Sequence, residues 1–164
     1  MFLGRVARAT VVLTLGLAMT AQPAGEADPL RGFKHRAEID ALVRGLRDGT
    51  RKGPQTLFAR EGGPYRVYTS FIDRRKGAAD IHATDDEIFV VLSGEAACTL
   101  GGDIEDKTLA RPHEYRGTRI VGGTTRPVGP GDIISAPRGT AHQMDPGAGH
   151  VLYIVIKVAG APAS

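Results

Sequence analysis

Short runs of β-prone residues, separated by glycine-rich turns, make up most of the chain after residue 54. The expected strands are Thr56–Phe58, Tyr65–Ile72, Ala78–Ala83, Glu87–Leu92, Glu95–Leu100, Asp132–Ser135 and Val151–Ile156. Many short strands with frequent turns are typical of a sandwich or a jelly-roll barrel. The 164 residues, with 22 glycines, 10 prolines and no tryptophan, suffice for one such domain with its own core. The sequence therefore predicts an all-β fold.

A helical pattern precedes these strands, over Phe33–Arg47. Its apolar residues recur at helical spacing and are Ile39, Leu42, Val43 and Leu46. Charged residues occupy the other face, and Gly49 is placed to end the helix. We expect one amphipathic helix on the outside of the barrel; an interaction helix for a partner is the alternative.

The first residues have the layout of a secretory signal peptide. Arg5 and Arg8 form a positive region, Ala9–Ala21 is mostly apolar, and Pro23 breaks the run. The run is shorter than the about 20 apolar residues of a membrane span. We therefore expect residues 1–25 to be a signal peptide and the protein to be periplasmic or secreted, with an uncleaved anchor as the alternative. After processing, no membrane association is expected.

Beyond this leader, we expect an N-terminal helical segment over residues 26–54 and the barrel over residues 55–160. The chain has a formal charge of +3, and the leader carries two arginines and no acid, which leaves +1. The only dense basic run is Arg74–Lys76, interpreted as a solvated strand end. The charge therefore does not indicate a nucleic-acid partner.

Two further features are interpreted from the sequence alone. Cys98 is the only cysteine, so an internal disulfide is excluded, and its apolar strand indicates a buried, inert thiol. The segment Gly101–Gly123 shows no sustained period and is expected to be a long loop, either a functional lid or a surface insertion. His113 in this loop is a weak candidate for a substrate contact, whereas His35 and His150 are expected to be structural or exposed.

Four potential metal ligands have a suggestive spacing. Asp80 and His82 are two residues apart on an expected strand, so their side chains share one face. Glu87 follows across a short turn, and an antiparallel pair joined by that turn brings it opposite His82. His142 comes much later, after a turn that contains proline and glycine. Two imidazoles and a carboxylate suit iron, manganese, nickel or zinc, so the sequence predicts a divalent metal site.

These residues also match two motifs at the correct internal spacings. The segment Asp80–Glu87, followed by six residues and Gly94, resembles the first cupin motif, His-x-His-(three or four)-Glu-(six)-Gly. The second motif, Gly-(five)-Pro-x-Gly-(two)-His-(three)-Asn, is matched by Gly131, Pro137, Gly139 and His142. The chain thus resembles small single-domain cupins of the type-2 class. The resemblance implies a double-stranded β-helix, or jelly-roll barrel, with one N-terminal helix.

The sequence departs from these motifs at two positions. Asp80 stands where the family has its first histidine, and Pro146 stands where it has asparagine. Asp80 can ligate through its carboxylate or act as an outer partner that orients His82 or a water. A third alternative is that the site has lost its metal. The tight turns at Gly94 and Gly139 are expected to need positive φ, which glycine tolerates.

The resemblance implies a small-molecule partner and a range of chemistries. Cupins with three protein ligands leave coordination positions for water, oxygen or a chelating substrate, which implies an oxygenase, isomerase or decarboxylase type of enzyme. The alternatives are a non-catalytic module that binds a small ligand and a metal-free structural barrel. Pairing through strand edges, as the family implies, would give a homodimer.

Overall fold

The computed structural model describes residues 32–59 and 63–160. The predicted signal peptide lies outside these residues. Within the described part of the chain, no helix has the length and apolarity to cross a membrane.

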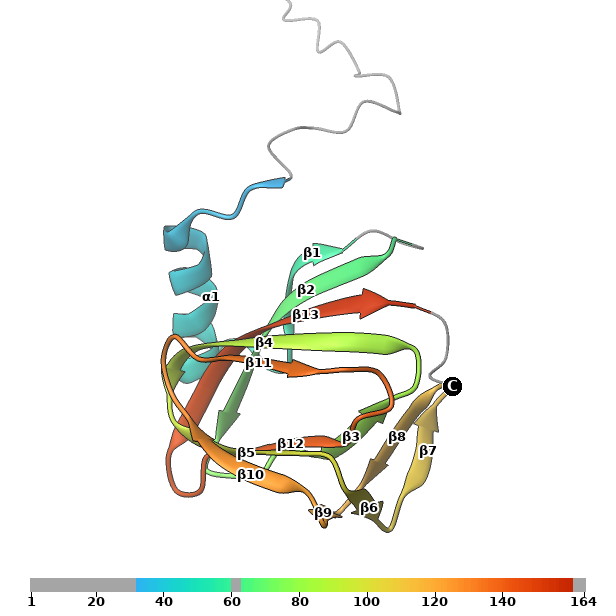
Figure 1. The fold of residues 1–164 in the computed structure, drawn as a ribbon. Coiled ribbons are helices and arrows are strands. Elements are labelled where there is room, and N and C mark those ends of the chain that lie inside the picture. The colour runs from blue at the N-terminus through green and yellow to red at the C-terminus, as the bar shows by residue number, and fades with distance from the viewer. Residues whose placement is uncertain (1–31, 60–62, 161–164) are drawn as a thin grey trace, which may run out of the picture.

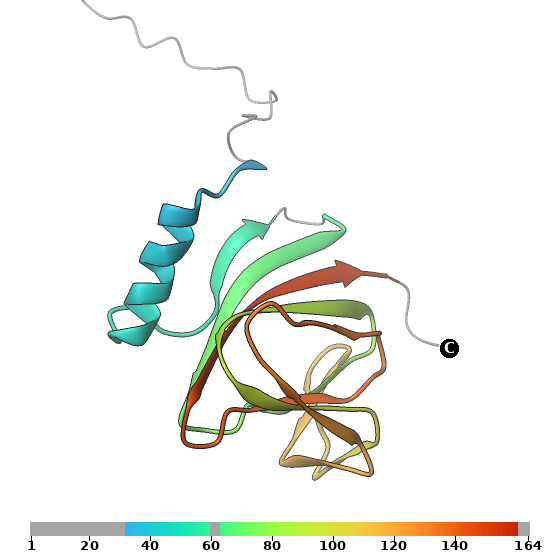
Figure 2. The same cartoon turned by 60° about the vertical axis from the view of Figure 1, so that its left-hand side comes forward.

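Two antiparallel sheets stack face to face to form the barrel (Figures 1 and 2). The five-stranded sheet has the order β1 (Gln55–Ala59), β2 (Tyr65–Asp73), β13 (His150–Ala159), β4 (Asp85–Gly94), β11 (Ile133–Ala136). The six-stranded sheet has the order β10 (Thr124–Val128), β5 (Ala96–Leu100), β12 (His142–Asp145), β3 (Ala79–His82), β8 (Glu114–Gly117), β7 (Thr108–Arg111). A third, two-stranded sheet pairs β6 (Asp103–Glu105) with β9 (Arg119–Val121). The all-β prediction is confirmed.

Alternation along two central strands decides which side chains enter the barrel. On β4, Glu87, Phe89 and Val91 are buried and the residues between them are less so. On β13, Tyr153, Val155 and Lys157 share the buried face. Successive side chains on a strand point to opposite faces, so Glu87 and Lys157 follow the core residues into the interior.

The helix α1 (Arg36–Arg47) forms within the expected range and lies outside the barrel (Figures 1 and 2). Glu38 accepts a hydrogen bond from the backbone N–H of His35 at 3.0 Å, so His35 has the structural role expected of it. Leu46 is buried, and Arg47 donates to Ser93 Oγ at 2.7 Å near the end of β4. The helix ends before Gly49, whose φ is 76°.

The expectation of a long loop over Gly101–Gly123 is wrong. The segment contains β6, β7, β8 and β9, and β8 joins the six-stranded sheet beside β3. These strands are three or four residues long, which is too short for an alternating pattern to be recognised in the sequence. The strand β12, with four residues, was missed for the same reason, and β10 was missed because its five residues are almost all exposed and include Pro127. Cys98 is buried in the main core, as expected, and burial raises the pKa of its thiol to about 11.

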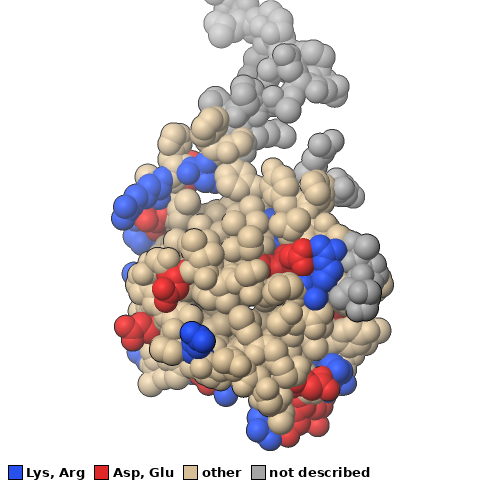
Figure 3. Space-filling view, in the orientation of Figure 1, with Lys and Arg blue, Asp and Glu red and all other residues tan. Residues whose placement is uncertain are grey.

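On the face shown in Figure 3, basic and acidic side chains are interspersed, and no patch of one sign dominates. Ion pairs of this kind also join neighbouring strands: Arg119 on β9 pairs with Glu105 on β6 at 2.6 Å.

Candidate metal centre

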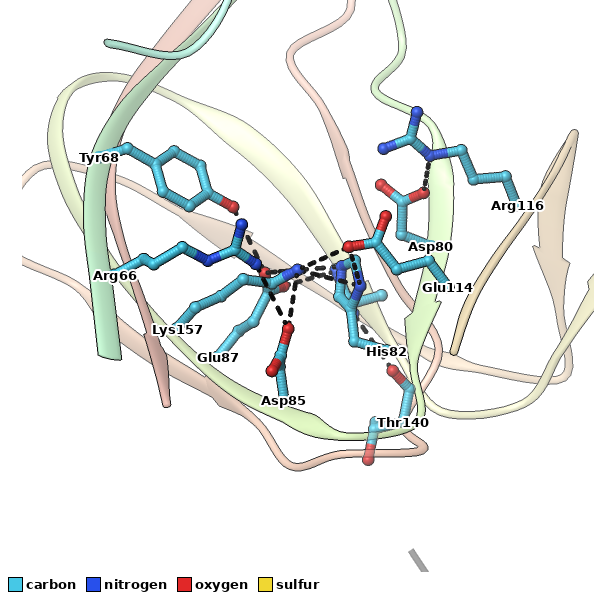
Figure 4. A network of polar contacts seen from close by, with 11 residues as sticks. Arg66, Tyr68, Asp80, His82, Asp85, Glu87, Glu114, Arg116, Thr140 and Lys157 are labelled. Carbon is cyan, nitrogen blue, oxygen red and sulfur yellow. Dashed lines mark hydrogen bonds and ion pairs between the residues drawn. The ribbon is translucent and has the colours of Figure 1, made fainter. Parts of the chain in front are cut away.

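The four predicted ligands come from strands of both sheets. Asp80 and His82 lie on β3, and His142 lies on β12 directly opposite Asp80. Glu87 lies on β4, in the other sheet. The expected hairpin between His82 and Glu87 is therefore wrong, because the chain crosses from one sheet to the other after β3. Glu87 instead faces His82 across the interior of the barrel (Figure 4).

The two histidines and Glu87 converge in this buried interior. His142 Nε2 is 2.9 Å from Glu87 Oε2, and His82 Nε2 is 3.5 Å from Glu87 Oε1. The two imidazole centroids are 5.3 Å apart. His82, Glu87 and His142 are 7%, 2% and 9% exposed. The structure thus brings together the three residues at the centre of the prediction.

Asp80 lies close to this cluster but is held by an arginine. Asp80, His82 and His142 each offer a donor atom within 4.8 Å of the others. Asp80 Oδ1, however, accepts a hydrogen bond from Arg116 Nε at 2.7 Å (Figure 4). This hydrogen bond occupies Oδ1 and leaves Oδ2, so the geometry fits Asp80 both as a direct ligand and as an outer partner of the cluster.

The turn before β12 orients His142. Gly139 has a φ of 79°, as expected from its place in the motif, and its N–H donates to the carbonyl oxygen of His82 at 2.8 Å. His142 Nδ1 is 3.2 Å from the carbonyl oxygen of Thr140. A carbonyl only accepts, so Nδ1 carries the hydrogen and Nε2 points to the centre of the cluster.

Sequence reasoning missed a cation inside the cluster. Lys157 on β13 is 4% exposed, and its Nζ lies 3.0 Å from His82 Nδ1 and 3.3 Å from Glu87 Oε1. Glu114 on β8 and Asp85 on β4 each approach the same ammonium at 3.4 Å. A lone lysine on the inward face of an apolar strand was the available signal, but the expected strand ended at Ile156. Glu114 gave no signal because its strand has four residues.

The electrostatics keep the carboxylate charged and one imidazole neutral. Burial alone would raise the pKa of Glu87, but the hydrogen bond and charge of His142, together with His82 and Lys157, lower it to about 2. Burial lowers the pKa of His82, with Glu87 opposing this effect and Lys157 adding to it. Burial and the charge of Glu87 raise the pKa of Tyr68, whose hydroxyl donates to Glu87 Oε1 at 3.4 Å. A carboxylate and a neutral imidazole are the forms that bind metals.

A cavity of about 530 Å³ opens onto the cluster. Its apolar walls include Phe89, Met144 and Val155. Its basic lining residues are Arg66, Arg75, Arg111, Arg116 and Lys157, and its acidic ones are Asp80, Glu87 and Glu114. His113, the weak candidate for a substrate contact, is exposed in the turn between β7 and β8, and its neighbour Glu114 lines the cavity instead.

The strand order and the site identify the architecture. Two antiparallel sheets enclose an interior. The residues of the first motif lie on β3 and β4, and His142 of the second motif lies on β12. Their side chains face one another in this interior. This is the double-stranded β-helix that the motifs imply. The chain has the cupin fold.

Comparisons with known proteins give distant likenesses. No family model and no curated protein matches the chain. Among solved structures, a cupin-2 domain from Rhodospirillum rubrum has 14% identity and a TM-score of 0.48, covering 68% of this chain and 61% of that one. A double-stranded β-helix protein from Klebsiella pneumoniae has 16% identity and a TM-score of 0.47, covering 69% and 83%. Oxalate oxidase in complex with glycolate has 20% identity and a TM-score of 0.42, covering 61% and 44%.

The chain thus spans less than two thirds of the Rhodospirillum rubrum protein and of oxalate oxidase. The cupin fold follows from the strand order and the motif residues of this chain. The likenesses carry no inference about its activity.

Proposed function

We propose that this cupin binds one divalent metal ion through His82, Glu87 and His142 and uses it to bind a small molecule in the cavity. The observation that carries the proposal is the 2.9 Å approach of His142 Nε2 to Glu87 Oε2. With Nδ1 committed to Thr140, the hydrogen bond between these two atoms needs a hydrogen on Nε2 in the metal-free protein, and a metal ion that binds here would take the place of that hydrogen.

The two imidazole–carboxylate separations fit a shared metal on distance, and the three residues fit it on chemistry. Donor atoms that each lie about 2.0–2.2 Å from a shared ion are about 3–3.5 Å apart. The two imidazole–carboxylate separations, 2.9 Å and 3.5 Å, match this range. A bound metal would act as a Lewis acid or redox centre towards a ligand in the cavity. The set suits iron, manganese, zinc or nickel.

The charge of the cavity favours an anionic ligand. Its lining carries five basic side chains against three carboxylates. A concave surface of one predominant sign raises the local concentration of the opposite charge. A small carboxylate that can also chelate a metal fits this lining and the volume of about 530 Å³. Oxygenase, isomerase and decarboxylase chemistry all act on such molecules, and a non-catalytic carrier of the same ligand is the second candidate.

Metal analysis of the full chain tests the proposal. Protein purified without a histidine tag is stripped with chelator, reloaded with Mn²⁺, Zn²⁺, Ni²⁺ or anaerobic Fe²⁺, and analysed for metal content and heat of binding. We expect near-stoichiometric metal that is lost in His82→Ala and in His142→Ala. His113→Asn is the matched control, because it removes an exposed histidine at φ 65°, a conformation that asparagine tolerates. A folded wild type that binds none of these ions contradicts the proposal.

Export is also part of the proposed function. The basic and apolar pattern of residues 1–25 supports it. Fractionation of cells that express the full chain, with mass spectrometry of the mature N-terminus, tests it. We expect a periplasmic or secreted product that begins between Met19 and Ala27; a cytosolic product with an intact N-terminus contradicts it.

A further inference from the structure

Lys157 is built into the candidate metal centre by the register of the sheet. It lies on β13 directly opposite Glu87 on β4, and directly opposite Arg66 on β2. Its side chain points into the barrel and ends among the acidic and imidazole groups of the cluster (Figure 4). An ammonium that is 4% exposed is costly to bury unless it is paired, and here three carboxylates lie within 3.4 Å of Nζ.

The shortest contact of Lys157 is with the imidazole of His82. Nζ and Nδ1 are 3.0 Å apart. An ammonium has three donors and no acceptor, so Nδ1 of His82 must accept this hydrogen bond. The hydrogen of the neutral ring is then on Nε2, the atom that faces Glu87 at 3.5 Å. That arrangement blocks the nitrogen through which His82 would bind the metal.

His82 differs in this respect from His142. The carbonyl of Thr140 holds the hydrogen of His142 on Nδ1 and leaves its Nε2 for the metal. His82 needs an equivalent acceptor beside its own Nδ1. Glu114 Oε1 is the candidate, at 3.6 Å from that atom. Lys157 and Glu114 therefore compete for one nitrogen, with opposite consequences for metal binding.

We propose that Lys157 is an internal competitor of the metal ion, which neutralises the cluster and blocks His82 until the metal displaces it and Glu114 takes over Nδ1. This inference rests on the proposed metal site and deepens it, because it names the residue that opposes loading. Metal binding then moves Lys157 from His82 and Glu87 towards Asp85 and Glu114. Lys157 also repels a divalent ion through its charge, at distances where little solvent intervenes.

The decisive measurement is the metal affinity of stripped Lys157→Met, by calorimetry and by competition with a chelator. Methionine keeps much of the length of the side chain and removes both the charge and the donors. We expect affinity to rise by about 10-fold or more, because the substitution removes a positive charge beside the ion. Lys107→Met is the matched control, because Lys107 pairs with Asp103 away from the barrel interior, and its affinity should equal that of the wild type. Glu114→Gln should weaken binding.

The outcomes separate this inference from the proposed site. If the wild type binds metal and folded Lys157→Met binds no more tightly, the competitor role is overturned and the metal site stands. If Lys157→Met binds metal and the wild type does not, the competitor role is supported and metal binding by the wild type is refuted. If neither folded protein binds metal, both proposals are overturned.

A second measurement does not depend on any variant. In the metal-free wild type, nitrogen-15 chemical shifts of the histidine rings report which nitrogen carries the hydrogen. We expect His82 to carry it on Nε2 and to accept at Nδ1. A hydrogen on Nδ1 of His82 in the metal-free protein overturns the inference, even if Lys157→Met fails to fold.

Discussion

Arg138 binds Asp86 and thereby connects the segment that carries Glu87 to the turn before His142. The backbone N–H of Arg138 donates to Asp86 Oδ1 at 2.8 Å, and its guanidinium Nε reaches the same oxygen at 3.0 Å. Asp86 immediately precedes Glu87, and Arg138 lies in the turn that leads to His142. Both hydrogen bonds lower the pKa of Asp86, to about 2. This contact therefore holds the residue before Glu87 against the turn that leads to His142.

Asp86→Asn is expected to weaken metal binding without removing any ligand. The amide keeps one acceptor for Arg138 but loses the charge that makes the bonds strong. We expect metal affinity to fall by about 10-fold or more, the usual cost of losing an outer partner. Calorimetry on the stripped protein measures it. Asp103→Asn, which breaks the exposed pair with Lys107, is the control, and equal affinities for the two variants would contradict the idea.

The sequence predicted which residues converge better than it predicted how the chain brings them together. The motif match identified His82, Glu87 and His142, because the spacings within two motifs do not depend on where the predicted strands begin and end. Their relative placement was wrong because spacing alone does not show whether a short turn joins strands of one sheet or crosses between two. A run of five residues between His82 and Glu87 fits both cases.

The rest of the site depends on contacts that no local pattern records. Glu114 reaches His82 from a strand of four residues in a segment without a recognisable period. Lys157 belongs to the cluster because β13 lies beside β4 in a particular register. Long-range strand pairing of this kind is set by the whole fold, so it is visible only in three dimensions.

Gly139→Ala is expected to destabilise the barrel and to disturb the site. The φ of 79° places this residue in the left-handed region, where a side chain costs about 1–2 kcal/mol. Urea unfolding of the metal-free protein measures the loss, and metal affinity should fall with it because this turn orients His142. Gly32→Ala is the matched control, since a Cβ there meets nothing within 4 Å. Equal stability of the two variants would show that alanine adopts the backbone conformation of position 139 without strain.

The stability of the metal-free protein should depend on pH through Glu87. Its pKa is about 2 in the folded state, against an ordinary value of 4.5. The unfolded chain therefore binds more protons between these values, and stability rises with pH there. The stabilisation is complete above about pH 4.5 and is lost as the pH falls towards 2. Urea unfolding from about pH 5 to about pH 2.5 measures the slope.

Glu87→Gln should reduce this slope, because the variant has no carboxylate to protonate at that position, while Asp86, whose pKa is also lowered to about 2, keeps its own contribution. Glu95→Gln, in the exposed turn after β4, removes a carboxylate outside the cluster and should keep the wild-type slope. Identical slopes for wild type and Glu87→Gln would mean that another group carries the dependence.

Substitution of Asp80 tests whether it ligates the metal or supports the ligands from outside. With Asp80 in an outer role, where Arg116 holds its Oδ1 at 2.7 Å, Asp80→Asn should lower metal affinity by about 10–100-fold, short of the loss in His82→Ala. Asp80→His places an imidazole at the position where the first cupin motif has one, and should tighten binding of zinc and nickel. Calorimetry with Zn²⁺ and Ni²⁺ on the stripped variants measures both effects.

The matched control for Asp80 separates its role from a general change in charge. Arg116→Gln frees the carboxylate of Asp80, whereas Arg119→Gln frees Glu105 on the small sheet outside the cluster. With Asp80 in an outer role, Arg116→Gln loosens its position and should weaken metal binding, while Arg119→Gln leaves it unchanged. If Asp80→Asn abolishes binding as fully as His82→Ala, or if Arg116→Gln tightens it, Asp80 is a direct ligand that Arg116 restrains. The centre would then have two imidazoles and two carboxylates.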